Sequence, residues 1–475
     1  MLFFSYLAKV KKILFNLLFT IFTVSCSFGQ ISYNINLLGR WNGAPNSDTT
    51  HLFTQKYNEM WGYAQGGREY ALLGGVAGYY FIEVTNPTHP VLRAYIPDLI
   101  SSRCINRDLK TYSHYAYLAA DNCANSSFIV ADLKYLPDSV HIVYQSDTIC
   151  TNIHSMYVEN NRLYACSTRN PGGVTGFYKM AVYSLQNPER PQLISVLDGP
   201  FGHTHQVTVY NDTAYCSNGF DGLFVYDYKN PANPVELMRI AGYQYSGYNH
   251  SSWLSPDHKK IVFTDEVPHN LPLKIYDISD FNNPELLSHI SSSTSKANKV
   301  PHIPYWKDNY IYCSYYTDGL RIFNVSDPRN PVEVGYYDTY PADNPDAEAS
   351  YVGNWGVYPF LPSGRIIASD MQTGLYIFDV HQAVSVQQSP DIFTETQIYP
   401  NPATDFIQIQ GSNYTAGNIR IQVMDTQGKI LINEQEKVSN ILSKQLNIQA
   451  LPAGVYILTL THEKGNSYHT KFVKK

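Results

Sequence analysis

The sequence predicts an all-β protein, a seven-bladed β-propeller followed by a small C-terminal β-sandwich. Composition is the first reason: of 475 residues, 44% are hydrophobic and only 16% charged, and the chain has 40 Tyr, 29 Gly and 27 Pro. Such usage favours short strands and many turns over long helices. The second reason is a strand-like run that recurs along most of the chain. The third is a different strand pattern at the C-terminal end.

The recurring run is an aliphatic or aromatic segment that mostly ends in an acidic or polar residue and an Asn-Pro type turn. The matching polar residues are Glu83, Asp132, Ser184, Asp227, Asp277, Asn324 and Asp379. Their separations of 43 to 55 residues are typical of propeller blades. In the fourth copy, strand-like runs cover 206–210, 213–217, 223–227 and 235–240, with turn residues between them. Four antiparallel strands per unit, repeated radially, make a propeller.

The last repeat has no convincing fourth strand after Val380. Residues 35–43 are similar to the outer strands of other repeats, such as 332–338. Pairing residues 35–43 with the seventh repeat closes the ring and removes two exposed sheet edges. We therefore expect a propeller over residues 30–382 that is closed by its N-terminal strand.

The N-terminus predicts export. Three lysines precede the apolar stretch 13–24, which is too short to span a bilayer stably and is typical of a secretory signal. We expect a signal peptide over 1–29, cleaved between Gly29 and Gln30, and no transmembrane anchor in the mature chain. Cys26 raises the alternative of a lipoprotein signal.

The net charge of −6, and the absence of any Lys- or Arg-rich run after the first dozen residues, argue against nucleic acid as a partner.

Six cysteines remain after removal of the signal, and their pairing cannot be read from the sequence. Cys216 and Cys313 occupy the same place in two repeats, where a small buried thiol is expected. Cys104, Cys123 and Cys150 lie in loop-like segments and are the better candidates for disulfides in an exported protein.

Several stretches of the repeats are similar to a known family. They include Gly67-Arg-Glu-Tyr-Ala-Leu, Tyr248-Asn-His-Ser-Ser-Trp-Leu-Ser-Pro-Asp-His and Asp318-Gly-Leu-Arg-Ile-Phe-Asn-Val-Ser-Asp-Pro, with 107–112 and 340–344. On these residues, the chain from about 35 to 380 resembles the choice-of-anchor B family of LVIVD-repeat propellers. The resemblance implies an extracellular location and surface attachment of varied kinds, and no particular activity.

After a polar linker at 383–393, a separate module is expected over 394–475. Its signature stretches are Ile398-Tyr-Pro-Asn-Pro-Ala-Thr-Asp, Ile421-Gln-Val-Met-Asp-Thr-Gln-Gly-Lys and Leu451-Pro-Ala-Gly-Val-Tyr-Ile-Leu, before the final Lys471-Phe-Val-Lys-Lys. Alternating strands with Gly-containing turns predict a small β-sandwich. The module resembles the type IX secretion C-terminal sorting domain. That resemblance implies the type IX machinery as a partner, and a place in the medium or on the outer face of a Gram-negative outer membrane. An ordinary adhesion-like sandwich is the alternative.

Four histidines occupy equivalent places in successive repeats. His154, His205 and His302 each precede an equivalent Tyr by ten residues, and His250 fits once two extra residues are allowed for. All four precede the first strand of a blade, which lines the central channel, so we expect them to converge into a ring. Such a ring could bind a divalent transition metal or an anionic ligand. The chain lacks HExxH, CxxC and DxDxDG patterns, so a purely structural role is the alternative.

Further ligand-binding candidates lie near the same ring. They are Arg107, Asp108, His203, Asp265, Glu266, Asn354 and Trp355. The Arg-Asp and Asn-Trp pairs take the ring position in the second and seventh blades, and His203 is an alternative to His205 in facing the axis. The loops that enter the first strands are long, and binding residues concentrate on such loops.

Two functions are compatible with these patterns. The first is a noncatalytic surface or secreted protein that binds an unidentified extracellular ligand on the long-loop face. The second is a metal-dependent hydrolase or lyase-like enzyme, with the four ring histidines as ligands and Asp265 or Glu266 as the base. No G-x-S-x-G motif supports a nucleophilic serine.

Overall fold

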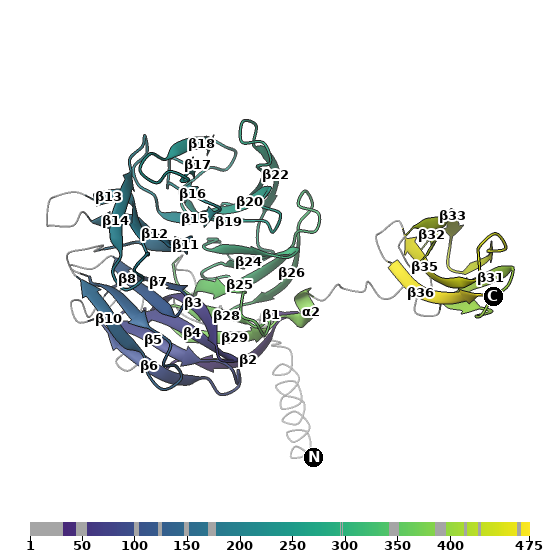
Figure 1. Cartoon of the computed structure of the whole chain (residues 1–475), viewed down its shortest axis with the longest axis horizontal. Coiled ribbons are helices and arrows are strands. Elements are labelled where there is room, and N and C mark those ends of the chain that lie inside the picture. The colour runs from purple at the N-terminus through teal and green to yellow at the C-terminus, as the bar shows by residue number, and fades with distance from the viewer. Residues whose placement is uncertain are drawn as a thin grey trace, which may run out of the picture. The chain divides into compact units, whose positions relative to one another are not determined.

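The computed structural model describes residues 32–43, 55–98, 104–121, 126–146, 152–169, 177–294, 296, 298–341, 351–384, 396–412, 416–425, 429–462 and 467–475. The predicted signal peptide with Gly29 and Gln30, and most of the predicted linker, lie outside these residues. The chain divides into two compact units, Met1–Val384 and Ser385–Lys475. Figure 1 shows a ring of sheets in the first unit and a small group of strands in the second.

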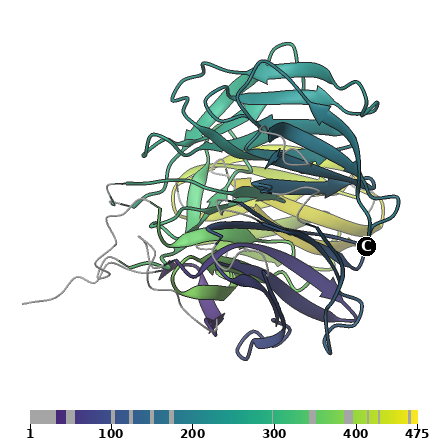
Figure 2. The same ribbon diagram turned by 90° about the vertical axis from the view of Figure 1, so that its left-hand side faces the viewer.

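The first four blades are four-stranded antiparallel sheets, seen from the side in Figure 2. Blade one consists of β3 (Tyr57–Gln65), β4 (Arg68–Gly75), β5 (Gly78–Glu83) and β6 (Val91–Pro97). Blade two consists of β7 (Asn106–Tyr112), β8 (Tyr115–Asp121), β9 (Phe128–Asp132) and β10 (His141–Ser146). Blade three consists of β11 (Ser155–Glu159), β12 (Arg162–Arg169), β13 (Phe177–Ser184) and β14 (Gln192–Leu197). Blade four consists of β15 (Gln206–Tyr210), β16 (Thr213–Ser217), β17 (Leu223–Asp227) and β18 (Val235–Ile240).

The remaining blades complete the ring. Blade five consists of β19 (Asn249–Leu254), β20 (Lys260–Asp265), β21 (Leu273–Asp277) and β22 (Glu285–Ile290). Blade six consists of β23 (Pro304–Lys307), β24 (Tyr310–Ser314), β25 (Leu320–Asn324) and β26 (Val332–Tyr337), with the short β1 (Ser32–Tyr33) as a fifth strand. Blade seven consists of β27 (Asn354–Tyr358), β28 (Ile366–Asp370) and β29 (Gly374–Asp379) with β2 (Asn36–Trp41). The short helix α2 (His381–Val384) follows β29.

The outer strand of blade seven comes from the start of the described chain. β2 runs antiparallel to β29, with Asn36 opposite Asp379 and Trp41 opposite Leu375 (Figure 1). β2 also passes close to blade one, because a Cβ atom on Gly39 would lie 1.9 Å from the carbonyl oxygen of Pro87. The N-terminal strand thus completes the sheet of blade seven through backbone hydrogen bonds, and its close approach to Pro87 brings it against blade one.

The core lies between neighbouring blades. One hydrophobic cluster, for example, joins Tyr164 and Cys166 of blade three to Val207, Phe224 and other residues of blade four. Because the middle strands of a blade, such as β17, are covered on both faces they are almost fully buried, whereas outer strands such as β18 are mostly exposed. The blades are therefore held together mainly by apolar side chains that neighbouring sheets share.

Among the cysteines that the structure describes, three are buried free thiols: Cys166, Cys216 and Cys313. Burial raises the pKa of Cys166 to about 12, so this thiol stays protonated and unreactive. Cys104 is disulfide-bonded. The other bridge candidates, Cys123 and Cys150, lie outside the described residues.

The second unit is a two-layer sandwich. One sheet has the order β30 (Gln397–Tyr399), β31 (Phe406–Gly411), β34 (Leu442–Asn447), and the other β33 (Ile430–Val438), β32 (Gly417–Met424), β35 (Gly454–His462), β36 (Ser467–Lys474). Ile407 and Ile409 of the first sheet share one core with Ile421 and Leu458 of the second. The predicted fold class, a seven-bladed propeller followed by a β-sandwich, is confirmed. Within the described part of the chain, no helix has the length and hydropathy that a membrane span requires.

Candidate functional site

A cavity of about 830 Å3 lies where the innermost strands of the blades begin. The innermost strands β3, β7, β11, β15, β19, β23 and β27 each contact the innermost strands of both neighbouring blades, and so form a closed ring. Several side chains just before the start of these strands line the cavity, among them His154, His205 and His302. Each of the seven blades contributes to the cavity wall.

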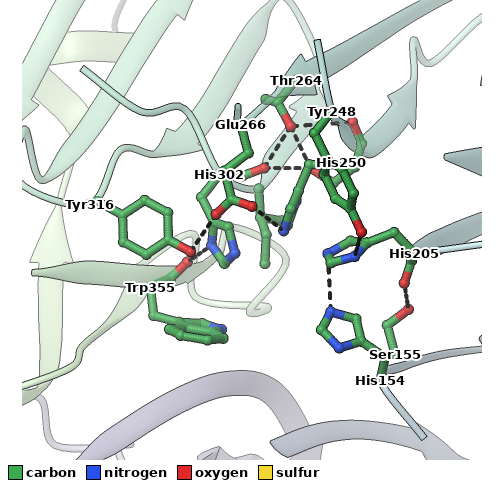
Figure 3. A network of polar contacts seen from close by, with 12 residues as sticks. His154, Ser155, His205, Tyr248, His250, Thr264, Glu266, His302, Tyr316 and Trp355 are labelled. Carbon is green, nitrogen blue, oxygen red and sulfur yellow. Dashed lines mark hydrogen bonds and ion pairs between the residues drawn. The ribbon is translucent and has the colours of Figure 1, made fainter. Parts of the chain in front are cut away.

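The four equivalent histidines lie side by side along this wall (Figure 3). The ring centroids of His154 and His205 are 4.1 Å apart, those of His205 and His250 4.2 Å, and those of His250 and His302 4.4 Å. Trp355 continues the arc, at 5.1 Å from His302. The structure therefore brings together all four residues that the repeat spacing singles out.

The first half of the arc is a chain of hydrogen bonds. His154 Nε2 lies 3.0 Å from His205 Nε2, and His154 Nδ1 lies 2.9 Å from Asp121 Oδ2. On the other side, the hydroxyl of Tyr248 lies 2.9 Å from His205 Nδ1 and 2.6 Å from His203 Nε2. Burial and the neighbouring imidazoles lower the pKa of His205 well below its ordinary value, so His205 is neutral.

These contacts assign one consistent set of protons. A carboxylate only accepts, so Nδ1 of His154 donates to Asp121 and its Nε2 accepts from Nε2–H of His205. Nδ1 of His205 then accepts from the hydroxyl of Tyr248, which itself accepts from Nε2–H of His203. Both nitrogens of His154 and both of His205 are used by neighbouring side chains.

The second half of the arc is a group of two histidines and a glutamate. Each of His250, Glu266 and His302 has one nitrogen or oxygen atom that could bind a metal, and these three atoms all lie within 4.8 Å of one another. His250 Nε2 is 3.8 Å from Glu266 Oε2. His302 Nδ1 donates to the carbonyl of Trp355 at 2.5 Å, and the hydroxyl of Tyr316 donates to Glu266 Oε1 at 2.8 Å (Figure 3). Nδ1 of His250 is buried and has no hydrogen-bond partner among the described residues.

Burial also sets the protonation of this group. It lowers the pKa of His302 to about 3 and that of His250 well below its ordinary value, so both imidazoles are neutral. Burial raises the pKa of Glu266 to about 6, against the hydrogen bond from Tyr316.

Opposite the arc, Glu59 of β3 lines the cavity beside an ion pair. Asp108 Oδ1 lies 2.5 Å from Lys110 Nζ, and Asp108 also accepts the backbone N–H groups of Leu109 and Met156. Burial raises the pKa of Glu59 to about 7, with Lys110 acting in the opposite direction. Glu59 is therefore a carboxyl group that titrates near neutral pH at the cavity wall.

Replacing Glu59 by Gln is expected to raise the melting temperature at pH 8 by several degrees. A carboxyl whose folded pKa is raised stabilises the fold while protonated, and this stability is lost as pH rises from about 4.5 to about 7. The wild-type protein should therefore lose stability between pH 5 and pH 8, and the variant should lose less. Thermal melting across this pH range measures the difference. Parallel curves for the two proteins would show that Glu59 is not desolvated.

Two phenylalanines stand exposed at the rim of the cavity. Phe177 is 55% exposed and Phe220 is 73% exposed. Phe220 lies edge-on to Tyr248, with ring centroids 5.2 Å apart. Large apolar side chains left open to water beside a polar cavity are typical of ligand-binding rims.

Two of the expected ligand-binding residues point away from the cavity. Asp265 is fully buried, pairs with Lys274 and accepts a 2.7 Å hydrogen bond from the hydroxyl of Tyr243. Asn354 is also fully buried, and its Nδ2 donates to the backbone carbonyls of Gly356 and Ser369. The expectation that Asp265 could act as the catalytic base is therefore corrected: its carboxylate is paired with Lys274 and does not line the cavity.

Arg107 lines the cavity, but most of the hydrogen-bonding capacity of its guanidinium is already used within the protein. Its guanidinium donates to the carbonyls of Gly75 and Val76 and to Asp98 Oδ2 at 2.8 Å. Asp108, Glu266 and Trp355, the second residues of the three neighbouring pairs, line the cavity as well.

Sequence reasoning missed Glu59, Asp121, Tyr248 and Tyr316. For Tyr248 a signal existed, since it precedes His250 by two residues as His203 precedes His205. Asp121 and Tyr316 come from other strands or loops, and nothing in the repeat pattern marks them.

The fold and this cavity define a seven-bladed β-propeller with a central cavity. Comparisons with known proteins add the type of repeat and the kind of C-terminal domain. The family model of the LVIVD repeat matches residues 201–241 and 306–339, and that of the secretion system C-terminal sorting domain matches 397–475. The chain thus carries LVIVD repeats and a C-terminal sorting domain. This domain indicates secretion or export to the cell surface through the type IX secretion machinery. Membership of the choice-of-anchor B family stays a prediction.

One curated relative matches part of the chain. An endo-acting ulvan lyase of Formosa agariphila is 27% identical over 94 residues, which are 20% of this chain and 17% of the lyase. The match spans less than a fifth of the lyase, so the activity of the lyase does not transfer to this chain.

Solved structures with a similar fold share little sequence. The periplasmic gluconolactonase PpgL of Pseudomonas aeruginosa is 10% identical, with a TM-score of 0.49 over 83% of this chain and 99% of its own. A putative 6-phosphogluconolactonase from Bacteroides uniformis is 12% identical, with a TM-score of 0.48 over 88% and 100%. PorZ of Porphyromonas gingivalis, a surface component of the type IX secretion system, is 11% identical, with a TM-score of 0.43 over 89% and 59%. Similarity at this level says nothing about function.

Proposed function

We propose that this exported propeller is a noncatalytic binding protein, on the outer face of the outer membrane or in the medium, and that its ligand occupies the cavity at the histidine arc. The observation that carries the proposal is the convergence of side chains from all seven blades, most of them polar, on one cavity. Its volume of about 830 Å3 lies in the range of about 300–1,000 Å3 that small-molecule sites occupy.

The lining favours a ligand that is not a polyanion. Both cationic side chains of the wall are already paired, Arg107 with Asp98 and Lys110 with Asp108. His205, His250 and His302 are held neutral by burial. Among the described residues, the wall therefore offers hydrogen-bonding groups without an unpaired lysine or arginine for an anion.

Exposed aromatic rings at the rim supply the apolar part of the site. Phe177 and Phe220 can pack against an apolar ring face, while His250, His302 and Glu59 can form hydrogen bonds with the ligand. A sugar ring has this combination of an apolar face and a polar edge. We therefore propose a neutral carbohydrate as the ligand class.

A glycan array followed by titration of the best ligand tests the proposal. We expect Phe220→Ala to weaken binding by about 3- to 10-fold, which is the loss of one aromatic contact. Tyr135→Ala is the matched control, because Tyr135 is also exposed (44%) and does not line the cavity. Equal affinities of both variants and the wild-type protein would place the ligand elsewhere.

A second candidate function is a metal-dependent hydrolase or lyase-like enzyme. The proximity of His250, Glu266 and His302 favours it, together with Glu59 on the same cavity. A carboxyl group with a pKa near 7 is suited to proton transfer at neutral pH. If glycans bound by the protein are also cleaved, Glu59→Gln should abolish cleavage and retain binding. Cleavage at the wild-type rate by this variant would exclude Glu59 as the acid or base.

A further inference from the structure

We infer that His250, Glu266 and His302 together bind one divalent transition-metal ion, whereas His154 and His205 do not. The inference deepens the proposed function, because the ion would face the same cavity, and its part in ligand binding rests on that function. It also differs from the expectation of a metal held by all four ring histidines.

The spacing of the three side chains fits one ion. Metal–ligand bonds of about 2.1 Å allow two ligand atoms to lie up to about 4.2 Å apart. His250 Nε2 and Glu266 Oε2 lie 3.8 Å apart, too far for a hydrogen bond and within this limit. The largest separation within the group is no more than 4.8 Å, so side-chain movements of about half an ångström would complete the site.

Hydrogen bonds already fix the orientation of two of the three ligands. The carbonyl of Trp355 holds the proton of His302 on Nδ1, which leaves the lone pair of Nε2 free. The hydroxyl of Tyr316 binds Glu266 Oε1, which leaves Oε2 directed toward His250 (Figure 3). Metal-bound histidines and carboxylates are oriented by just such outer contacts.

The third ligand has an unexplained buried nitrogen. His250 is 95% buried, and its Nδ1 has no hydrogen-bond partner among the described residues. A buried polar atom without a partner is rare and points to a missing water or ion. Because Nε2 is the atom that faces Glu266, an ion bound there would fix the proton of the imidazole on Nδ1.

The other half of the arc cannot serve in the same way. His154 and His205 share a hydrogen bond between their Nε2 atoms, and their Nδ1 atoms bond to Asp121 and Tyr248. No lone pair remains for a metal unless this chain breaks. The arc therefore divides into a hydrogen-bonded half and a metal-binding half.

The ligand set also selects the type of ion. Two imidazoles and a carboxylate suit zinc and other first-row divalent ions, whereas calcium and magnesium prefer all-oxygen sites. Three protein ligands leave coordination positions open toward the cavity, where a hydroxyl group of a bound ligand or a water molecule can coordinate.

Calorimetric titration of the metal-stripped, purified protein with ZnCl2 tests the inference. We expect one zinc per chain, and no heat from CaCl2. His250→Ala and His302→Ala should weaken zinc binding by about 100-fold or more, and Tyr316→Phe by about 10-fold. His154→Ala is the matched control from the same arc and should bind zinc within about 3-fold of the wild-type protein.

Several outcomes would overturn the inference. They are no zinc binding by the folded wild-type protein, or a loss in His154→Ala equal to that in His302→Ala. The wild-type titration does not depend on the folding of any variant, and His250→Gln provides a second, polar replacement if the alanine variant melts early. Glycan binding by zinc-free protein would leave the proposed function standing and remove the metal from it. Zinc binding by a protein that binds no glycan would leave the metal site standing and contradict the proposed function.

Discussion

Replacing Arg107 by Leu is expected to lower the free energy of unfolding by about 3 to 5 kcal/mol. Arg107 and Asp98 form an ion pair whose side chains are both fully buried, and the guanidinium also donates to the carbonyls of Gly75 and Val76. Leucine removes the cation and leaves a carboxylate and two carbonyls in a dry environment, where unpaired polar groups are costly. Because the pair lies between blades one and two, its loss should loosen that junction first.

Chemical denaturation and thermal melting measure this effect. Arg329→Ala is the matched control, because Arg329 pairs with Glu285 at a similar distance of 2.9 Å but both side chains are 56% exposed. An exposed pair contributes about 0 to 1 kcal/mol. If both variants melt at the same temperature, the buried pair does not stabilise the propeller.

Deleting residues 397–475 is expected to reduce export across the outer membrane to background, so that the propeller stays in the periplasm. This segment is the one that the sorting-domain family model matches, and it folds around a core of its own. Cell fractionation and surface labelling of a cell with a type IX secretion system measure the result.

Glu436→Ala serves as the control for this deletion. It removes an exposed partner of Lys444 without touching the core of the sandwich, so export should be unchanged. A truncated propeller that reaches the surface at the wild-type level would show that the segment is not needed for sorting.

The fold was predictable because each blade repeats the same strand and turn chemistry. The missing fourth strand after Val380 was enough to predict an N-terminal partner, and β2 occupies that position. The addition of β1 to blade six was not predictable, since two residues, Ser32 and Tyr33, carry no periodic pattern.

The candidate site was predictable where it follows the repeat. The four histidines occupy one repeated position, so the ring geometry placed them together. Glu59, Asp108 and Trp355 each lie 24 residues before the closing acid of their blade, Glu83, Asp132 or Asp379. This spacing could have identified Glu59.

What the repeat could not give is the pairing of side chains. Asp265 and Glu266 are neighbours in the sequence, yet one forms a buried pair with Lys274 and the other lines the cavity. The division of the histidine arc into two halves likewise depends on Asp121, Tyr248 and Tyr316. Their positions follow from three-dimensional packing.

A crystal structure of the protein with zinc, with anomalous differences measured at the zinc edge, tests the central claim most directly. We expect one anomalous peak in the cavity, within bonding distance of His250, Glu266 and His302. A peak between His154 and His205, or no peak in the cavity, would contradict the account.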